Sequence, residues 1–245
     1  MSGALANIAY IVAAILFIFG IKMLGSADSA RRGNLVSAAG MLLAVVVTLL
    51  KSGMDYQWVL IGLGIGAVIG GVWARVVRMT GMPELVALFN GFGGFASVFV
   101  AWSEYQRYHV AGGFGDDPQT TFLAAVIAAA VWIGSTTFSG SLVAWGKLSG
   151  KLSGKPTVLP RQRLIAIVLL ALAVLGGIVY AAFPDSVFAY WLFVAVLVAG
   201  LGLGVFAVLP IGGGDMPVVI SLLNSLSGLA ASAAGFAIQN NVLIV

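Results

Sequence analysis

The sequence predicts an all-α polytopic membrane protein, a bundle of eight complete transmembrane helices followed by the start of a ninth. Only 8% of the 245 residues are charged, against about 25% in ordinary soluble domains. A further 61% are hydrophobic, and the mean hydropathy is +1.10. A spanning helix needs about 20 apolar residues, and suitable runs lie near residues 4–24, 35–50, 56–77, 83–102, 119–145, 162–183, 187–209 and 216–238. We therefore expect residues 1–245 to form a single transmembrane domain.

Two apolar runs are shorter than a full membrane span, the second run and the run at the end of the sequence. The second run covers only residues 35–50. After Gln239-Asn240-Asn241, apolar residues resume and the sequence stops at Val245. We interpret residues 242–245 as the beginning of a ninth helix that the end of the sequence cuts off.

The basic residues predict the topology. When the loops are assigned alternately to the two sides, Lys51 and Arg107 fall on one side. Ten basic residues fall on the other: Lys22, Arg31, Arg32, Arg75, Arg78, Lys147, Lys151, Lys155, Arg161 and Arg163. Cytoplasmic loops are enriched in Lys and Arg, so we expect the N-terminus to lie outside. The basic loop at 146–163 is then cytoplasmic, where each charge near anionic lipid headgroups contributes about 1 kcal/mol.

Several chemistries are excluded by composition. The chain has no cysteine and one histidine, which excludes disulfides, thiolate chemistry and a transition-metal cluster. The segment GIGAVIGG (64–71) imitates a phosphate-binding loop, but it lies inside an apolar helix with no strand before it. We expect this chain to bind no dinucleotide, no metal and no nucleic acid, and to be surrounded by the lipid bilayer.

A repeat with an offset of 134 residues relates two parts of the chain. MPELVALFNGFGGFA (82–96) superposes on MPVVISLLNSLSGLA (216–230) with six of fifteen positions identical. The same offset pairs Gly66 and Gly70 with Gly200 and Gly204 in the preceding helices, and small residues at this spacing let helices approach closely. We expect a parallel internal repeat of residues 59–97 and 193–231, related by an axis along the membrane normal.

Each copy of the repeat carries one asparagine, Asn90 or Asn224, seven residues after a proline. At 1.5 Å per residue each amide would lie about 10 Å into the apolar core. An amide there must bond to another helix or line a hydrated path. The helix expected at 119–145 adds hydroxyls at Ser135, Thr136 and Ser139, with Thr137 and Ser141 beside them. These hydroxyls can bond back to their own helix or line the same path, and the sequence does not choose.

The acidic residues are expected near the membrane surfaces. Glu84 and Asp215 each flank a proline that begins a helix, where a carboxylate can cap free N–H groups and offset the helix dipole. Asp215 follows a flexible loop that includes Gly213 and Gly214, which a soluble domain could contact. We place the other acids in loops: Asp28, Asp55, Glu104, Asp116, Asp117 and Asp185. We expect His109 to be a solvated loop residue on the outer face. No residue at mid-membrane depth is then expected to titrate near neutral pH.

The combination of MPELVALFN, GSTTFSGSLVAWGKLSGKLSGKPTVLP, IGGGDMPVVISLLNSLSGLAASAAGF and NNVLIV resembles one family. It is similar to the membrane portion of the beta subunit of the proton-translocating NAD(P)+ transhydrogenases, from the first helix to Val245. The resemblance implies coupling of hydride transfer between NAD(H) and NADP(H) to proton movement across a bacterial inner membrane. It also implies that NADP(H) binds a domain after the last beta-subunit helix, that NAD(H) binds the alpha subunit, and that alpha–beta units form dimers.

The resemblance assigns roles to three residues. Asn224 matches an asparagine of the family's proton path, and Asp215 matches an acid at the membrane face near the NADP(H) domain. Asn90 matches a position where many members have histidine, and an amide cannot store a proton. We therefore expect Asn90 and Asn224 to flank a hydrated path between helices 83–102 and 216–238. A histidine of the alpha subunit would supply the titrating group. The alternatives are a parallel-repeat transporter of ions or small solutes and a structural membrane anchor.

Overall fold

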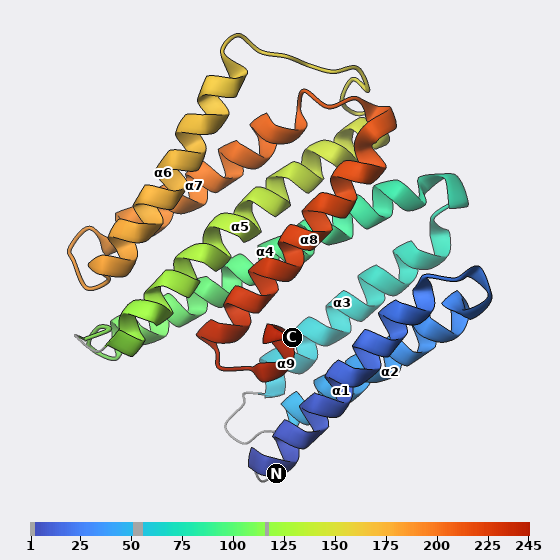
Figure 1. The fold of residues 1–245 in the computed structure, drawn as a ribbon, viewed down its shortest axis with the longest axis horizontal. Coiled ribbons are helices and arrows are strands. Elements are labelled where there is room, and N and C mark those ends of the chain that lie inside the picture. The colour runs from blue at the N-terminus through green and yellow to red at the C-terminus, as the bar shows by residue number, and fades with distance from the viewer. Residues whose placement is uncertain (1–2, 51–55, 116–117) are drawn as a thin grey trace. The chain divides into compact units, whose positions relative to one another are not determined.

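The computed structural model describes residues 3–50, 56–115 and 118–245, and the regular elements in these ranges are all helical (Figure 1). Eight helices are long and apolar enough to cross a membrane, and a short α9 (Asn241–Ile244) follows them. The predicted all-α polytopic fold is therefore confirmed. The chain forms two compact units, one of residues 1–72 with 240–243 and 245, the other of residues 73–239 with 244.

In the first unit, α1 (Gly3–Leu24) and α2 (Ala27–Leu49) form a tight antiparallel hairpin. Glycines permit the close approach, because a Cβ atom on Gly33 would lie only 2.7 Å from the carbonyl oxygen of Gly20. Tyr10 and Thr48 share a hydrogen bond of 3.0 Å between their hydroxyls across the hairpin. The third helix, α3 (Tyr56–Val76), has no buried residue.

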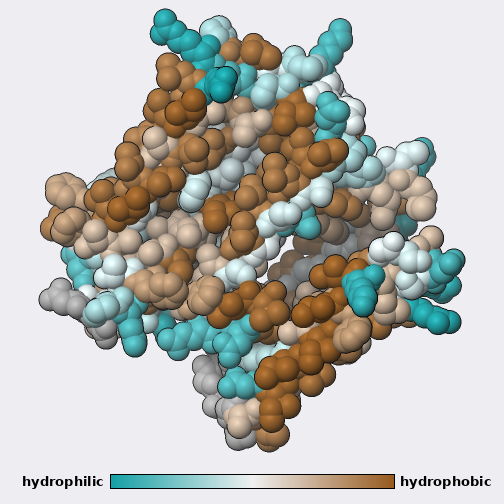
Figure 2. All heavy atoms as spheres, in the orientation of Figure 1, coloured by the Kyte–Doolittle hydropathy of each residue, from teal (hydrophilic) through white to brown (hydrophobic). Residues whose placement is uncertain are grey.

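In the second unit, α5 (Pro118–Leu148) is the central helix. It contacts α4 (Met82–Val110), α6 (Gln162–Ala182), α7 (Ala189–Val208) and α8 (Met216–Ala237). Ile127 and Val131 of α5 pack with Tyr180 and Phe193 in one core cluster, and a second cluster lies nearer the C-terminal end of α5. Hydrophobic side chains cover the lengths of the helices on the visible face, and hydrophilic residues lie mainly near helix ends (Figure 2).

The helices that begin the two repeat copies start with the same backbone conformation. A 3-10 turn, Met79–Gly81 or Gly213–Asp215, precedes α4 and α8, and Pro follows the first helical Met in both. The residue before α4, Gly81, has φ −91° and ψ 0°, and the residue before α8, Asp215, has φ −92° and ψ −1°. The repeated sequence therefore folds alike locally, whereas the proposed axis relating residues 59–97 to 193–231 stays a prediction.

Two helices extend beyond their predicted bounds. The second helix begins at Ala27 rather than near residue 35, and α4 continues to Val110 rather than ending near 102. Both extensions are polar, so hydropathy missed them, although a helix satisfies its own backbone hydrogen bonds regardless of side-chain polarity.

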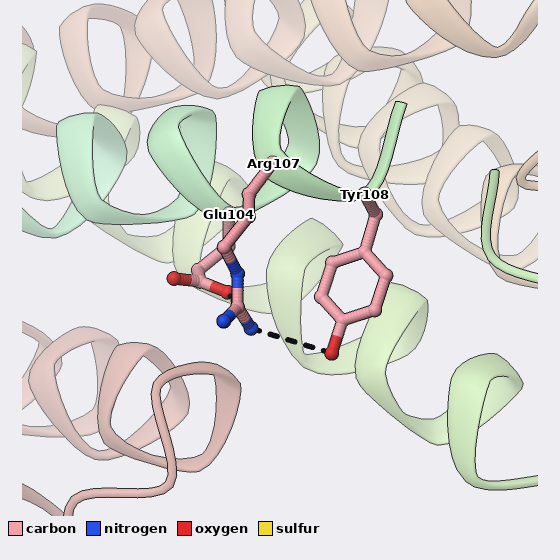
Figure 3. A network of polar contacts seen from close by, with 3 residues as sticks. All are labelled: Glu104, Arg107 and Tyr108. Carbon is pink, nitrogen blue, oxygen red and sulfur yellow. Dashed lines mark hydrogen bonds and ion pairs between the residues drawn. The ribbon is translucent and has the colours of Figure 1, made fainter. Parts of the chain in front are cut away.

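The predicted loop positions of Asp28, Glu104 and His109 were wrong for the same reason, and His109 is an exposed residue in the last turn of α4. Asp28 lies in the first turn of α2, where a carboxylate offsets the helix dipole. Glu104 lies in α4, where it is 9% exposed and its Oε2 lies 2.8 Å from Nη2 of Arg107 (Figure 3). The Arg107 Nη2 also donates to the hydroxyl of Tyr108 at 3.4 Å. The predictions for Lys51, Asp55, Asp116 and Asp117 lie outside the described residues.

Candidate functional site

The amide of Asn90 joins three helices. Its Nδ2 donates to the hydroxyl of Ser141 on α5 at 2.9 Å, and its Oδ1 accepts from the hydroxyl of Ser227 on α8 at 2.8 Å. The Ser227 hydroxyl also lies 3.3 Å from the Asn90 carbonyl oxygen. Asn90 is 9% exposed. The amide is therefore a buried polar junction of α4, α5 and α8, with hydroxyls on both of its functional atoms.

Close packing of α4 on α5 brings this junction together. A Cβ atom on Gly94 would lie 2.8 Å from the carbonyl oxygen of Gly134, and one on Gly134 would lie 2.6 Å from that of Gly94. Gly91, next to Asn90, faces the Cβ of Ser141 at 3.2 Å in the same construction. A side chain at Gly94 or Gly134 would force the helices apart, so these glycines set the helix separation that lets Asn90 reach Ser141.

Four hydroxyls of the predicted α5 cluster donate to carbonyls of their own helix, whereas the fifth, Ser141, accepts from Asn90. Ser135 and Thr136 both donate to the carbonyl of Trp132, at 3.0 and 2.8 Å. Ser139 lies 3.1 Å from the Ser135 carbonyl and 3.3 Å from that of Thr136. Thr137 behaves likewise with Ile133 at 2.8 Å. For these four hydroxyls the structure shows bonding back to the helix, the common behaviour of Ser and Thr in helices.

The four predicted packing glycines have different surroundings. Gly200 and Gly204 of α7 lie against α5, and a Cβ atom on Gly200 would meet the Trp132 carbonyl oxygen at 2.9 Å. Gly66 and Gly70 of α3 have no atom of the described chain within 4 Å of an added Cβ. The close approach predicted for both pairs is thus seen for the α7 pair, and the first unit provides no neighbour for the α3 pair.

Asn224 lies on the exposed side of α8, and the structure does not bring its amide to Asn90. Ser227, one turn later, makes the Asn90 contact instead. Ser221, Ser225 and Gly228 are exposed on the same stretch of α8, and we call these three residues with Asn224 the α8 polar face. Ser225 donates to the Ser221 carbonyl at 3.3 Å. Among the described residues, the Asn224 amide has no hydrogen bond.

Asp215 occupies the predicted position at the start of α8 and is exposed, but its carboxylate makes no capping hydrogen bond. Gly213 and Gly214 form the 3-10 turn with it. The Gly213 N–H donates to the carbonyl of Gly154 at 2.8 Å, which ties this turn to the α5–α6 loop. Glu84 lies in the first turn of α4, as predicted.

Lys147, in the last turn of α5, is a buried charged residue that sequence reasoning missed. It was counted as a surface charge of the basic loop, but it belongs to α5 and is only 4% exposed. Its Nζ lies 2.5 Å from the carbonyl oxygen of Leu209, 2.6 Å from that of Ile211 and 3.3 Å from that of Lys155. No sequence signal separates it from its neighbour Lys151, which is exposed and lies 4.2 Å above the ring of Trp145.

The described part of the chain contains neither a group of metal-binding side chains nor a nucleotide-binding loop. The structure groups no three His, Cys, Asp or Glu side chains there that could hold a metal ion. The glycine-rich segment 64–71 lies in the middle of α3, as the sequence predicts. The polar features that remain are the Asn90 junction, the α8 polar face and the loops around Lys147.

Comparison with known proteins identifies the family. A family model described as NAD(P) transhydrogenase beta subunit matches residues 6–245. The chain belongs to this family. Two curated relatives, both NAD(P) transhydrogenase subunit beta of Rhodospirillum rubrum and one of them from a named strain, are each 40% identical to it over 249 residues.

The aligned region covers 100% of this beta-subunit chain and 52% of each relative, so the chain spans about half the length of the relatives it matches. The family resemblance stated from the sequence motifs is thereby confirmed. The match also favours the transhydrogenase prediction over the small-solute transporter, and the eight candidate spans agree with a multi-pass membrane protein.

Proposed function

We propose that this chain is the proton-translocating membrane part of an NAD(P) transhydrogenase. In the complete enzyme, hydride transfer between NAD(H) and NADP(H) is coupled to the movement of protons across the membrane. NAD(H) and NADP(H) bind soluble domains, and this chain binds neither. The proposal rests on the family match and on the arrangement of the two asparagines.

The observation that carries the proposal is the exposed amide of Asn224. It lies within a helix of 22 residues that is apolar enough to span the membrane. A primary amide facing hydrocarbon without a partner is costly, so in the membrane it must meet water or another polar group. Another protein helix or a hydrated path therefore covers this side of α8.

The repeat suggests how that side is covered. Asn90, Gly91 and Gly94 of α4 correspond, at the offset of 134, to Asn224, Ser225 and Gly228 of α8. The α4 residues are buried against α5, where Asn90 bonds to a serine. Those of α8 are exposed, and an added Cβ on Gly228 meets no atom within 4 Å. The α8 polar face is thus suited to receive a helix of the alpha subunit as α4 receives α5.

A proton path at this place would run along α8 between the Asn90 junction and the alpha subunit. Amides and hydroxyls can order water molecules into a hydrogen-bonded chain along which protons move, but they do not store a proton. A histidine of the alpha subunit, with an ordinary pKa near 6.5, would load and release it. Ser135, Thr136 and Ser139 bond within α5, so in this proposal they accept no proton from the path.

The soluble NADP(H) domain would meet the membrane part at Gly213, Gly214 and Asp215. Asp215 is exposed at the start of α8, twelve residues before Ser227, so a change there is transmitted by one continuous helix. The ten-to-two distribution of basic residues supports a cytoplasmic position for this end and an outer N-terminus. We place the protein in the bacterial inner membrane as a dimer of alpha–beta units.

The test uses Asn224→Leu in the complete enzyme, with alpha subunit and full-length beta subunit in sealed vesicles. Proton movement is followed with a trapped pH-sensitive dye, and hydride transfer with an NAD+ analogue whose reduction changes its absorbance. We expect proton-coupled turnover to stop. Val218→Leu, at a position of α8 that is 75% exposed, is the control for the added side chain. Proton pumping that survives Asn224→Leu unchanged would refute the path.

A further inference from the structure

The ammonium group of Lys147 is held by three backbone carbonyls of the described chain. The Nζ has three N–H donors, and the carbonyl oxygens of Leu209, Ile211 and Lys155 lie within hydrogen-bonding distance of it. Among the described residues, no carboxylate pairs with it. Burying a charge without hydrogen-bond partners costs free energy, so the buried ammonium group depends on the three carbonyls. We call Lys147 and these three carbonyls the lysine clamp.

The lysine clamp joins two loops that are far apart in the sequence. Leu209 and Ile211 belong to the α7–α8 loop, and Lys155 belongs to the α5–α6 loop. Backbone bonds reinforce the union, because Thr157 N–H donates to the Leu209 carbonyl at 3.2 Å and Gly213 N–H to that of Gly154 at 2.8 Å. These hydrogen bonds therefore join the two loops and the C-terminal end of α5 to one another.

The lysine clamp lies between the two features that the proposed function must connect. The α7–α8 loop leads directly into Gly213–Asp215, the turn assigned to the NADP(H) domain. In the other direction along α5, Ser141 lies six residues before Lys147, about 9 Å along the helix axis. Ser141 is the serine that accepts from Asn90. A shift of the loop would therefore reach α5 through Lys147 and the Asn90 junction through Ser141.

We propose that Lys147 is a positioning residue that couples the turn at Gly213–Asp215 to the Asn90 junction, and this rests on the proposed function. It transfers no proton itself. It holds the end of α5 and the start of α8 in one geometry, so that movement of the turn by the soluble domain alters the polar junction rather than being absorbed by the loops. Without it, hydride transfer and proton movement should separate.

The test compares Lys147→Met with Lys151→Met in the complete alpha–beta enzyme in sealed vesicles. Both changes remove one positive charge from the same end of the protein, but Lys151 is exposed and contacts a Trp ring instead of carbonyls. For Lys147→Met we expect hydride transfer to continue while the number of protons moved per hydride falls at least about fivefold, the lower range of typical coupling between sites. Lys151→Met should keep the wild-type ratio.

A Lys147→Met enzyme with the wild-type ratio, or an equal loss in both variants, would refute the role of the lysine clamp. If Lys147→Met does not assemble, Lys147→Gln, which keeps two N–H donors, takes its place under the same criterion. Failure of both to assemble would show a role in folding only, and would also refute the proposal. A wild-type enzyme that transfers hydride without proton movement would instead refute the proposed function itself, and the lysine clamp's coupling role with it.

Discussion

Helices α4 and α8 begin with the same motif and nearly identical backbone angles, yet their equivalent side chains have opposite surroundings. Asn90 and Gly94 of α4 are buried against α5, whereas Asn224 and Gly228 of α8 are exposed. The preceding helices reverse the pattern, because a Cβ added to Gly66 of α3 meets no atom of the described part of its unit within 4 Å, whereas its counterpart Gly200 packs on α5. A repeated sequence thus sets the local fold, but the neighbours decide what each copy does.

The largest effect expected from this comparison is at the glycines of α4 and α8. Gly94→Ala would place its Cβ 2.8 Å from the Gly134 carbonyl oxygen and 3.0 Å from the Thr137 Cβ, so α4 and α5 must separate. Overpacking of this kind costs about 2–3 kcal/mol of stability. Gly228→Ala should change stability by less than about 0.5 kcal/mol. The midpoint of unfolding in SDS for the purified proteins measures both, and equal losses would contradict the contrast.

A smaller effect with the reverse order is expected in α7 and α3. Gly200→Ala brings a Cβ against the Trp132 carbonyl and the Ser135 hydroxyl, and only the hydroxyl can rotate away. We expect a loss of about 1–2 kcal/mol. Gly66→Ala adds a methyl group where nothing lies within 4 Å, and alanine is the better helix former, so stability should hold or rise slightly. The same unfolding measurement decides, and a larger loss at Gly66 would break the comparison.

The smallest effect on stability concerns the asparagines themselves. Asn90→Leu removes bonds to Ser141 and Ser227, and interhelical bonds in membranes contribute on average about 0.6 kcal/mol each, so a loss of about 1 kcal/mol is expected. Asn224→Leu removes no bond within the described chain, so the isolated protein should keep its stability while coupling is lost in the complete enzyme. An isolated Asn224→Leu chain as unstable as Asn90→Leu would show that Asn224 also has a structural role.

Much of the fold could be predicted from the sequence, because lipid imposes a strong rule on helix length and polarity. The eight spans were located by hydropathy, and their errors, at Ala27 and Val110, fall where polar residues continue a helix past the apolar core. The repeat motif also predicted the shared helix starts at Met82 and Met216. Hydropathy carries no information on a helix that leaves the apolar layer, and this is why Glu104 was misplaced.

The site was predicted less completely, since side-chain partners depend on which helices meet. The polar character of Asn90 was evident from the sequence, but its bonds to Ser141, 51 residues away, and Ser227, 137 residues away, require the packed bundle. Lys147 differs from the basic residues of the following loop because it lies in the last turn of α5, where its side chain is buried. That burial follows from the contact of α5 with α7 and α8, which no local pattern records.

The long sequence separations at the Asn90 junction bear on how the protein is made. Ribosomes add about 5–20 residues per second, so Ser227 is synthesised about 7–27 seconds after Asn90, which it joins across 137 residues. Ser141 arrives much earlier, so α4 can pair with α5 through one side of the amide while the other side awaits its partner. The junction is therefore completed only when α8 has been made, and α8 is also the helix that exposes the α8 polar face.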